Sequence, residues 1–217
     1  MQQKNIFITG GTGYIGKAII PELLKKGHKV TVLVRKGSEN KIIPGCDIIF
    51  GSALDETTFA DKVNSADSFI HLVGVSHPKP SKAELFKTID LVSAKASVLA
   101  AKKSGVKHFI YISVAHPAPI MKAYIEVRTE AERFIKENLD NATIIRPWYV
   151  LGPSHRWPYI LYPAYWILKR IPSTKESARR LDLVTLKQMV RTIIKAVESP
   201  PSGIRVIEAQ EIKKFRS

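Results

Sequence analysis

Residues 4–26 read KNIFITGGTGYIGKAIIPELLKK, and this stretch decides the fold. Three consecutive apolar residues, Ile6, Phe7 and Ile8, are typical of a short buried strand. A glycine-rich segment follows at once, and apolar residues then recur at helical spacing as far as Gly27. The sequence therefore predicts a buried strand, a tight turn and an amphipathic helix in direct succession.

The glycines of this turn suit a phosphate site. Gly10 permits a tight turn, Gly13 lets the backbone approach a pyrophosphate, and Gly16 lets the helix pack close to the strand. The N–H groups and the dipole at the start of the helix favour the phosphates. An ordinary strand-to-helix turn of an α/β protein is the alternative. The cofactor-binding residues predicted for this turn are Gly10, Thr12, Gly13, Tyr14, Ile15 and Gly16.

The rest of the chain alternates between strands and helices. We expect further strands at 29–34, 47–50, 68–73, 108–113, 142–146 and 204–208, and helices at 57–63, 81–104, 121–138 and from 186 to about 197. This alternation predicts an α/β fold: a doubly wound parallel sheet in a single domain, 1–217, with a small C-terminal helical or lid region. On the helix at 81–104 the expected buried stripe is Leu85, Ile89, Val92, Ala96 and Leu99.

Composition excludes several classes of protein. A chain of 217 residues with 45% hydrophobic and 24% charged residues is globular rather than disordered. Cys46 is the sole cysteine, which excludes an internal disulfide and fits a reducing compartment. No apolar run of about 18 residues occurs, so we expect no membrane-spanning helix. The first strand leaves no room for a signal peptide, and we expect a cytoplasmic protein.

The formal net charge is +15, with Lys and Arg spread over the whole chain. No nucleic-acid-binding motif accompanies this charge, so we do not expect a nucleic-acid partner. Solvated basic faces and a phosphate-bearing cofactor account for it more simply. We assign no metal site.

Residues 9–16, TGGTGYIG, resemble the T-G-x-x-G-x-x-G pattern of the short-chain dehydrogenase/reductase superfamily in its extended and atypical branches. The resemblance covers roughly 4–200. Residues 51–55 resemble the G-D-x-x-D segment beside the adenine, with Ser52 where an acid is usual. Residues 71–74 resemble the loop over the ribose and nicotinamide, and 146–153 the R-P-x-x-x-x-G-P loop. The further cofactor contacts that this implies are Ser52, Ala53, Leu54, Leu72, Val73, Gly74, Pro147, Tyr149 and Val150.

The end of the strand at 29–34 predicts NADP rather than NAD. In dinucleotide folds an acidic residue at this place binds the ribose 2′-hydroxyl of NAD, whereas an arginine accommodates the 2′-phosphate of NADP. Here Arg35 and Lys36 follow the strand, and the first acid is Glu39. Two solvated cations are the alternative interpretation.

The resemblance also implies a catalytic Tyr-x-x-x-Lys pair and an upstream hydroxyl. Tyr124 and Arg128 have this spacing, which places both side chains on one face of the helix at 121–138. Arg128 supplies positive charge beside the tyrosine and a ligand for ribose, but it does not readily exchange a proton. Ser113 is the candidate hydroxyl, for cofactor binding as well as catalysis. The usual position of this hydroxyl falls on Val114 or Ala115. A packing role for Tyr124 is the alternative.

Residues 154–180 form a different kind of segment. Aromatic residues crowd 157–168, and Arg and Lys flank them. The family builds its substrate lid at the corresponding place. A helix docked on the core, a lid, and a contact with a membrane surface or a protein through 157–170 remain as three interpretations.

Two functions are compatible with these patterns. The first is an NADP-dependent reductase, or an epimerase or dehydratase, acting on a small carbonyl or sugar-like substrate. The second is an NADP-binding redox sensor, or an assembly or accessory subunit, without turnover. Tyr124 and the aromatic segment favour the first, whereas Arg128 in place of lysine and the short loop before Tyr124 favour the second.

Overall fold

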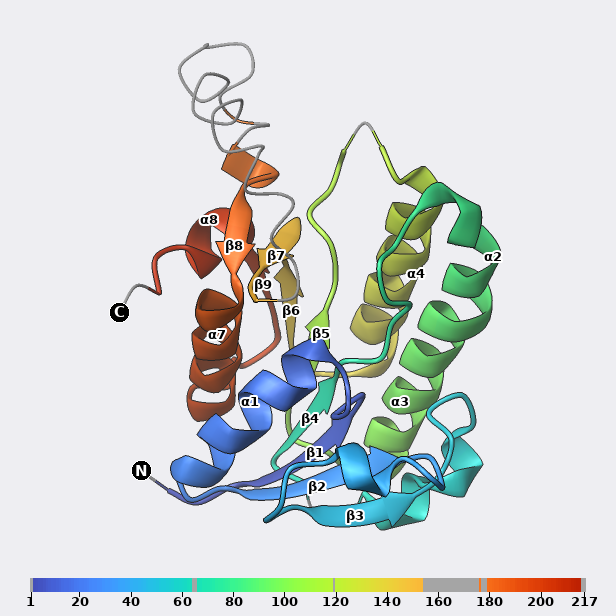
Figure 1. The fold of residues 1–217 in the computed structure, drawn as a ribbon, viewed down its shortest axis with the longest axis vertical. Coiled ribbons are helices and arrows are strands. Elements are labelled where there is room, and N and C mark those ends of the chain that lie inside the picture. The colour runs from blue at the N-terminus through green and yellow to red at the C-terminus, as the bar shows by residue number, and fades with distance from the viewer. Residues whose placement is uncertain (1, 64–65, 119, 154–175, 177–178, 216–217) are drawn as a thin grey trace.

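A computed structural model describes residues 2–63, 66–118, 120–153, 176 and 179–215 (Figure 1). It contains a seven-stranded parallel sheet in the order β3-β2-β1-β4-β5-β6-β9, and a parallel pair, β7 with β8. This confirms the doubly wound α/β fold. The strands are β1 Asn5–Thr9, β2 Lys29–Val34, β3 Asp47–Phe50, β4 Ser68–His71, β5 Phe109–Ile112, β6 Ala142–Arg146, β7 Tyr149–Leu151, β8 Leu183–Thr185 and β9 Ile204–Glu208.

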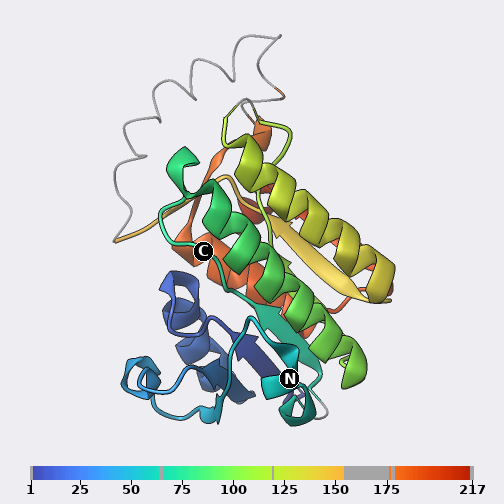
Figure 2. The ribbon, with the colours of Figure 1, turned by 90° about the vertical axis from the view of Figure 1, so that its right-hand side faces the viewer.

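Helices cover both faces of the large sheet. Helices α1 and α7 lie on one face, and α3 and α4 lie side by side on the other (Figures 1 and 2). The helices are α1 Tyr14–Lys25, α2 Ala83–Leu85, α3 Val92–Lys103, α4 Lys122–Asn138, α7 Leu186–Glu198 and α8 Ala209–Ile212. Alternate residues of β1 serve the two layers: Ile6 and Ile8 pack with Ile20 of α1, whereas Phe7 packs in the cluster that includes Ala131 of α4. Because both faces are covered, the strands are apolar almost throughout.

Some elements differ from the sequence prediction. The strand expected at 68–73 ends at His71, and the segment at 57–63 forms two 3₁₀ turns instead of a helix. Strand β7 and helix α8 were not predicted. No helix within the described ranges has both the length and the apolar character needed to cross a bilayer.

The predicted buried stripe on the helix at 81–104 is confirmed at Ala96, which is buried, and Ile89 is half-buried, but the prediction is wrong at its other three positions. Leu85, Val92 and Leu99 are 42%, 40% and 38% exposed, whereas Phe86 and Asp90 are fully buried. The segment Phe86–Leu91 is π-helical, and its wider turn shifts every later residue relative to a regular 3.6-residue period. Apart from Val98, the buried residues of α3 are Ser and Ala, whereas Val92 and Leu99 point outward.

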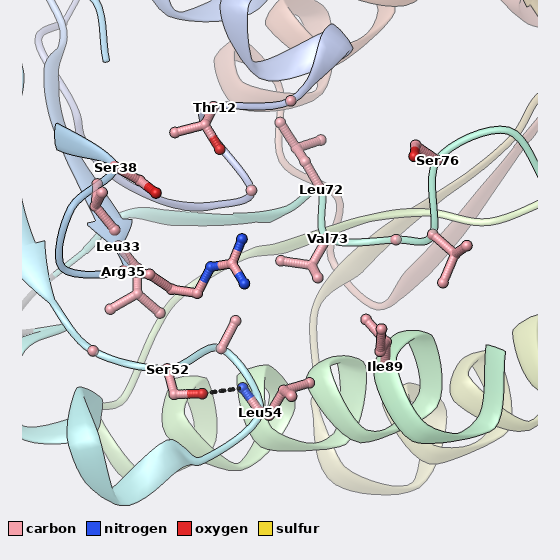
Figure 3. Close-up of a pocket in the computed structure, with 17 residues that line it drawn as sticks. Thr12, Leu33, Arg35, Ser38, Ser52, Leu54, Leu72, Val73, Ser76 and Ile89 are labelled. Atoms are coloured by element: carbon pink, nitrogen blue, oxygen red, sulfur yellow. Dashed lines mark hydrogen bonds between the residues drawn. The ribbon is translucent and has the colours of Figure 1, made fainter. Parts of the chain in front are cut away.

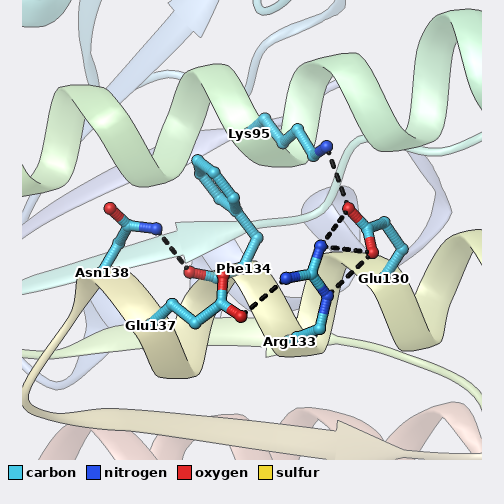
Figure 4. Close-up of polar contacts among 6 residues, drawn as sticks. All are labelled: Lys95, Glu130, Arg133, Phe134, Glu137 and Asn138. Carbon is cyan, nitrogen blue, oxygen red and sulfur yellow. Dashed lines mark hydrogen bonds and ion pairs between the residues drawn. The ribbon is translucent and has the colours of Figure 1, made fainter.

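Polar contacts on the outer surface fix α4 beside α3 (Figure 4). Lys95 of α3 pairs with Glu130 of α4 at 3.1 Å and lies over the ring of Phe134. Arg133 then joins Glu130 at 2.8 Å and Glu137 at 2.6 Å along α4. Exposed pairs of this kind add little to stability, but a connected network favours one alignment of the two helices.

Two histidines are buried at the sheet. His71 Nδ1 lies 2.9 Å from the hydroxyls of both Thr9 and Ser97, and His108 Nε2 lies 2.9 Å from the Thr143 hydroxyl. Burial, together with nearby cations, lowers the pKa of each ring to about 3; the cations are Arg128 for His71, and Arg205 and Lys4 for His108. Both rings are therefore neutral in the folded protein near neutral pH.

These histidines predict acid lability. The unfolded chain protonates them near pH 6.5 and the folded chain only near pH 3, so the free energy of unfolding should fall as the pH falls through this window. Each ring contributes about 1.4 kcal/mol per pH unit there, against a total stability of about 5–15 kcal/mol. Urea unfolding between pH 7.5 and pH 4 measures this slope. His108→Gln should reduce the slope by up to about 1.4 kcal/mol per pH unit, and His77→Gln, at an exposed position, is the matched control. An unchanged slope in His108→Gln would contradict the assignment.

Candidate functional site

The glycine-rich turn after β1 has the geometry that its sequence predicts. Gly10 has a φ of 78°, and a Cβ there would lie 2.6 Å from the carbonyl carbon of Leu72. A Cβ on Gly16 would lie 2.5 Å from the carbonyl oxygen of Gly11. A side chain at position 10 would push the turn away from the end of β4, and a side chain at position 16 would push α1 away from the turn. The turn therefore brings the start of α1 to the carboxyl end of β1.

A cavity of about 410 Å³ opens at the carboxyl ends of β1 to β4 (Figure 3). Several of its lining residues were predicted from the sequence, namely Gly10, Thr12, Gly13, Arg35, Ser52, Ala53, Leu54, Leu72, Val73 and Gly74. The prediction missed Leu33, Val34, Ser38, Gly51, Val75, Ser76 and Ile89. Most of the missed residues are chain neighbours of predicted ones, and a wider window at each strand end would have found them. Ile89 comes from the π-helical segment on the far side of the cavity, and no local pattern marks it.

The other predicted site residues lie outside this cavity. They are Tyr14, Ile15, Gly16, Lys36, Ser113, Tyr124, Arg128, Pro147, Tyr149 and Val150. Tyr14 extends from the start of α1 toward the end of β7, because a Cβ on Gly152 would lie 1.8 Å from its hydroxyl. The proposed lid or contact segment at 154–180 lies almost entirely outside the described residues, and its role stays a prediction.

Arg35 gives the cavity its charge. Its guanidinium points into the cavity, on the same side as Ser38 and Ser52 (Figure 3). None of the described residues that line the cavity carries a carboxylate. Lys36, the other cation predicted here, is exposed and does not line it.

Arg128 is buried in a cluster next to the cavity. Its Nη2 donates to Asp90 Oδ2 at 2.8 Å, and its Nη1 donates to the carbonyl of Ile112 at 2.9 Å and to the Tyr111 hydroxyl at 3.2 Å. Its guanidinium carbon lies 5.0 Å from the centre of the Tyr124 ring. Burial disfavours the charged form of Arg128, but the two tyrosines and Asp90 outweigh burial and raise its pKa. Arg128 is therefore a fixed charge beside Tyr124 and not a proton carrier.

Ser113 is turned toward α4. Its hydroxyl donates to Glu132 at 2.5 Å, and the residue is 3% exposed. Arg146 also donates to Glu132 through Nε at 2.9 Å and through Nη2. Burial opposes the charged form of Glu132, but the hydrogen bonds from Arg146 and Ser113 hold its pKa below the ordinary value. In this arrangement the Ser113 hydroxyl is committed to a carboxylate in the protein interior.

The glycine turn, the parallel sheet and the cavity over its carboxyl edge define a nicotinamide-dinucleotide-binding protein of the short-chain dehydrogenase/reductase superfamily. The model of the NAD(P)H-binding family matches residues 10–159, and the chain belongs to that family.

Curated relatives match over parts of their length. The chain is 39% identical over 83 residues to dTDP-6-deoxy-L-talose 4-dehydrogenase (NAD(+)) of Aggregatibacter actinomycetemcomitans, covering 36% of this chain and 31% of the relative. It is 27% identical over 157 residues to the ceramide reductase of Caulobacter vibrioides, covering 69% and 47%. It is 23% identical over 139 residues to the photosystem II assembly factor Ycf39 of Synechocystis, covering 62% and 42%. The matched parts are thus less than half of each relative.

Solved structures share the fold. WbmH of Bordetella bronchiseptica, in complex with NAD+, superposes with a TM-score of 0.69 at 22% identity, covering 94% of this chain and 75% of that one. WbmG of the same organism, in complex with NAD and UDP, gives 0.67 at 20% identity, covering 98% and 76%. At this identity the likeness establishes the fold alone.

Proposed function

We propose that the chain binds NADP(H) with its pyrophosphate at the start of α1 and its adenosine 2′-phosphate at Arg35. The observation that carries this proposal is the Arg35 guanidinium, which points into a cavity without a carboxylate among its described lining residues. A free ribose diol is best bound by an acid at the end of β2, and here the end of β2 offers a cation and Ser38 instead. Structural neighbours hold NAD, so the choice of cofactor rests on this chain's own residues.

Arg35→Glu is expected to reverse the preference between cofactors. A charge-assisted hydrogen bond to phosphate contributes about 1.5–3 kcal/mol, so NADPH binding should weaken by about tenfold to a hundredfold. NADH binding should become tighter, because the introduced carboxylate can accept a hydrogen bond from the 2′-hydroxyl. Isothermal titration with both cofactors measures this. Lys36→Glu changes the net charge equally outside the cavity and should have a much smaller effect. Equal losses in the two variants would show general electrostatics instead of a contact.

We further propose that the chain is a reductase, or an epimerase or dehydratase, for a small carbonyl or sugar-like substrate. The half-buried Tyr124 is the proton donor, and Arg128 stabilises the charge that forms beside it. The bound dinucleotide supplies the hydride chemistry. The names of several relatives, among them a dTDP-sugar dehydrogenase and a UDP-glucose 4-epimerase, support a sugar nucleotide as the substrate class.

A second function, cofactor binding without turnover, rests on a specific observation. The hydroxyl that would assist Tyr124 is missing from its usual place: Val114 and Ala115 are buried there, and Ser113 is bound to Glu132. Likeness to an assembly factor, Ycf39, agrees with this alternative. A panel of carbonyl compounds and nucleotide sugars, assayed by NADPH absorbance alongside NADPH titration, separates the two. Turnover of any substrate supports the enzyme, whereas tight binding without turnover supports the module.

A further inference from the structure

Asp90 touches two parts of the molecule that are far apart in the sequence. It lies in the π-helical segment between α2 and α3, and its side chain is 0% exposed. Oδ1 accepts the backbone N–H of Val75 at 2.7 Å, and Oδ2 accepts Arg128 Nη2 at 2.8 Å. Val75 lines the cavity, whereas Arg128 belongs to α4. One buried carboxylate therefore holds the cavity wall and α4 at the same time.

The guanidinium of Arg128 also lies directly against the cavity wall. A Cβ on Gly74 would be 2.6 Å from Arg128 Nη2 and 3.7 Å from Asp90 Oδ2. Gly74 is itself a lining residue. The absence of a side chain at this position is what lets the ion pair approach the wall, so the pair and the loop at 72–76 are packed as one unit.

Tyr124 is packed on the same ion pair. Its ring lies 5.0 Å from the guanidinium carbon of Arg128 and 5.0 Å, edge to face, from the ring of Phe86. Phe86 comes from the same π-helical segment as Asp90. These two ring contacts of Tyr124 thus come from Arg128, which is bonded to Asp90, and from Phe86, which lies in the same π-helical segment as Asp90.

We propose that Asp90 is a positioning residue that couples the wall of the dinucleotide cavity to the Tyr124–Arg128 pair. The proposal rests on the proposed function, because the coupling matters when NADP(H) occupies the cavity. Asp90 accepts hydrogen bonds from both Val75 and Arg128. When the cofactor displaces Val75, Asp90 moves and its bond to Arg128 changes; when Arg128 shifts, Asp90 moves and its bond to Val75 changes. If the ion pair served stability alone, its removal would lower the melting temperature and leave the cavity wall of the folded protein unchanged.

The test is a double-mutant cycle with Asp90→Asn and Arg128→Gln. Two quantities are measured on each folded variant: amide exchange at Val75 without cofactor, and the Kd for NADPH. Asp90→Asn should speed Val75 exchange and weaken NADPH binding, each by about tenfold, because one charged hydrogen bond is lost. The Val75 amide is bonded to Asp90 and not to Arg128, yet Arg128→Gln should speed exchange there too. In the double variant the Val75 exchange rate and the NADPH Kd should be no higher than in Asp90→Asn.

Asp182→Asn is the matched control. Asp182 is also buried, accepts the N–H of Leu183 at 2.9 Å and pairs with Lys213 at 2.6 Å, but it does not line the cavity. Asp182→Asn should lower the melting temperature and leave Val75 exchange and the NADPH Kd unchanged.

The proposal is overturned if Asp90→Asn and Arg128→Gln change these two quantities no more than Asp182→Asn does. If Asp90→Asn fails to fold, Arg128→Gln is compared with Arg128→Lys, which keeps a cation for Asp90 but also changes the contact with Gly74. Faster Val75 exchange in Arg128→Gln than in Arg128→Lys supports coupling through Asp90, and equal exchange in the two variants overturns it. If wild type binds no dinucleotide, the proposed function fails, while the exchange measurements still test the coupling.

Discussion

Gly13→Asp is expected to abolish NADPH binding in a protein that remains folded. Gly13 is the N-cap residue of α1, with extended backbone angles (φ −79°, ψ 179°), and it makes no side-chain cap. Aspartate is among the best N-cap residues, so the new carboxylate should bond to the first turn of α1. It would then occupy the place where the helix start attracts the pyrophosphate. The variant thus separates binding from folding.

The size of this effect follows from the charges. Two unit charges about 4 Å apart near a protein surface repel by about 4 kcal/mol, which is about a thousandfold in Kd. The new Cβ would lie 3.1 Å from the carbonyl oxygen of Gly10, so a small shift of the turn offsets part of the capping gain. Gly13→Ser makes the same cap and the same close contact without the charge, and it should keep most of the affinity. Calorimetry with NADPH and thermal unfolding on both variants give the answer. Unchanged affinity in folded Gly13→Asp would place the pyrophosphate elsewhere.

The sequence alone predicted the sheet well, for a local reason. In a doubly wound sheet helices lie on both faces, so most strands, the edge strands β3 and β9 among them, are short apolar runs bounded by polar or turn residues. The bounds of Lys29–Val34, Asp47–Phe50, Ala142–Arg146 and Ile204–Glu208 were predicted to the residue. Of the buried face of α3 only Ala96 was predicted, because small residues form most of that face and a π-helical turn changes its phase.

The same contrast applies to the candidate site. The lining residues near Gly10 and Arg35 follow strands directly, so sequence order is enough to place them at the carboxyl edge of the sheet. The ion pair between Asp90 and Arg128 spans 38 positions, and the bond from Ser113 to Glu132 spans 19. No spacing rule connects residues so far apart, and only the packing of α3 and α4 on the sheet brings them together.

Tyr124→Phe is expected to reduce turnover by about 10²–10⁴ if the protein reduces or isomerises a carbonyl substrate. The substitution removes the transferable proton and keeps the ring that packs on Phe86 and Arg128. Stability and the Kd for NADPH should therefore change little. Arg128→Lys should keep part of the activity, since it retains a positive charge, whereas Arg128→Ala should reduce both the rate and cofactor binding.

Tyr111→Phe is the matched control for Tyr124→Phe. The Tyr111 hydroxyl accepts from Arg128 at 3.2 Å, but the residue is fully buried, and burial raises its pKa to about 12. It cannot deliver a proton to a substrate, so Tyr111→Phe should cost far less turnover. Equal losses in the two variants would mean that both tyrosines act only by holding Arg128. Turnover that survives Tyr124→Phe undiminished would remove Tyr124 from the reaction. If the wild type binds NADPH but turns over no substrate, the protein is a cofactor-binding module and Tyr124 has a packing role. Asp90 and Arg128 would still connect Tyr124 to the cavity in that module.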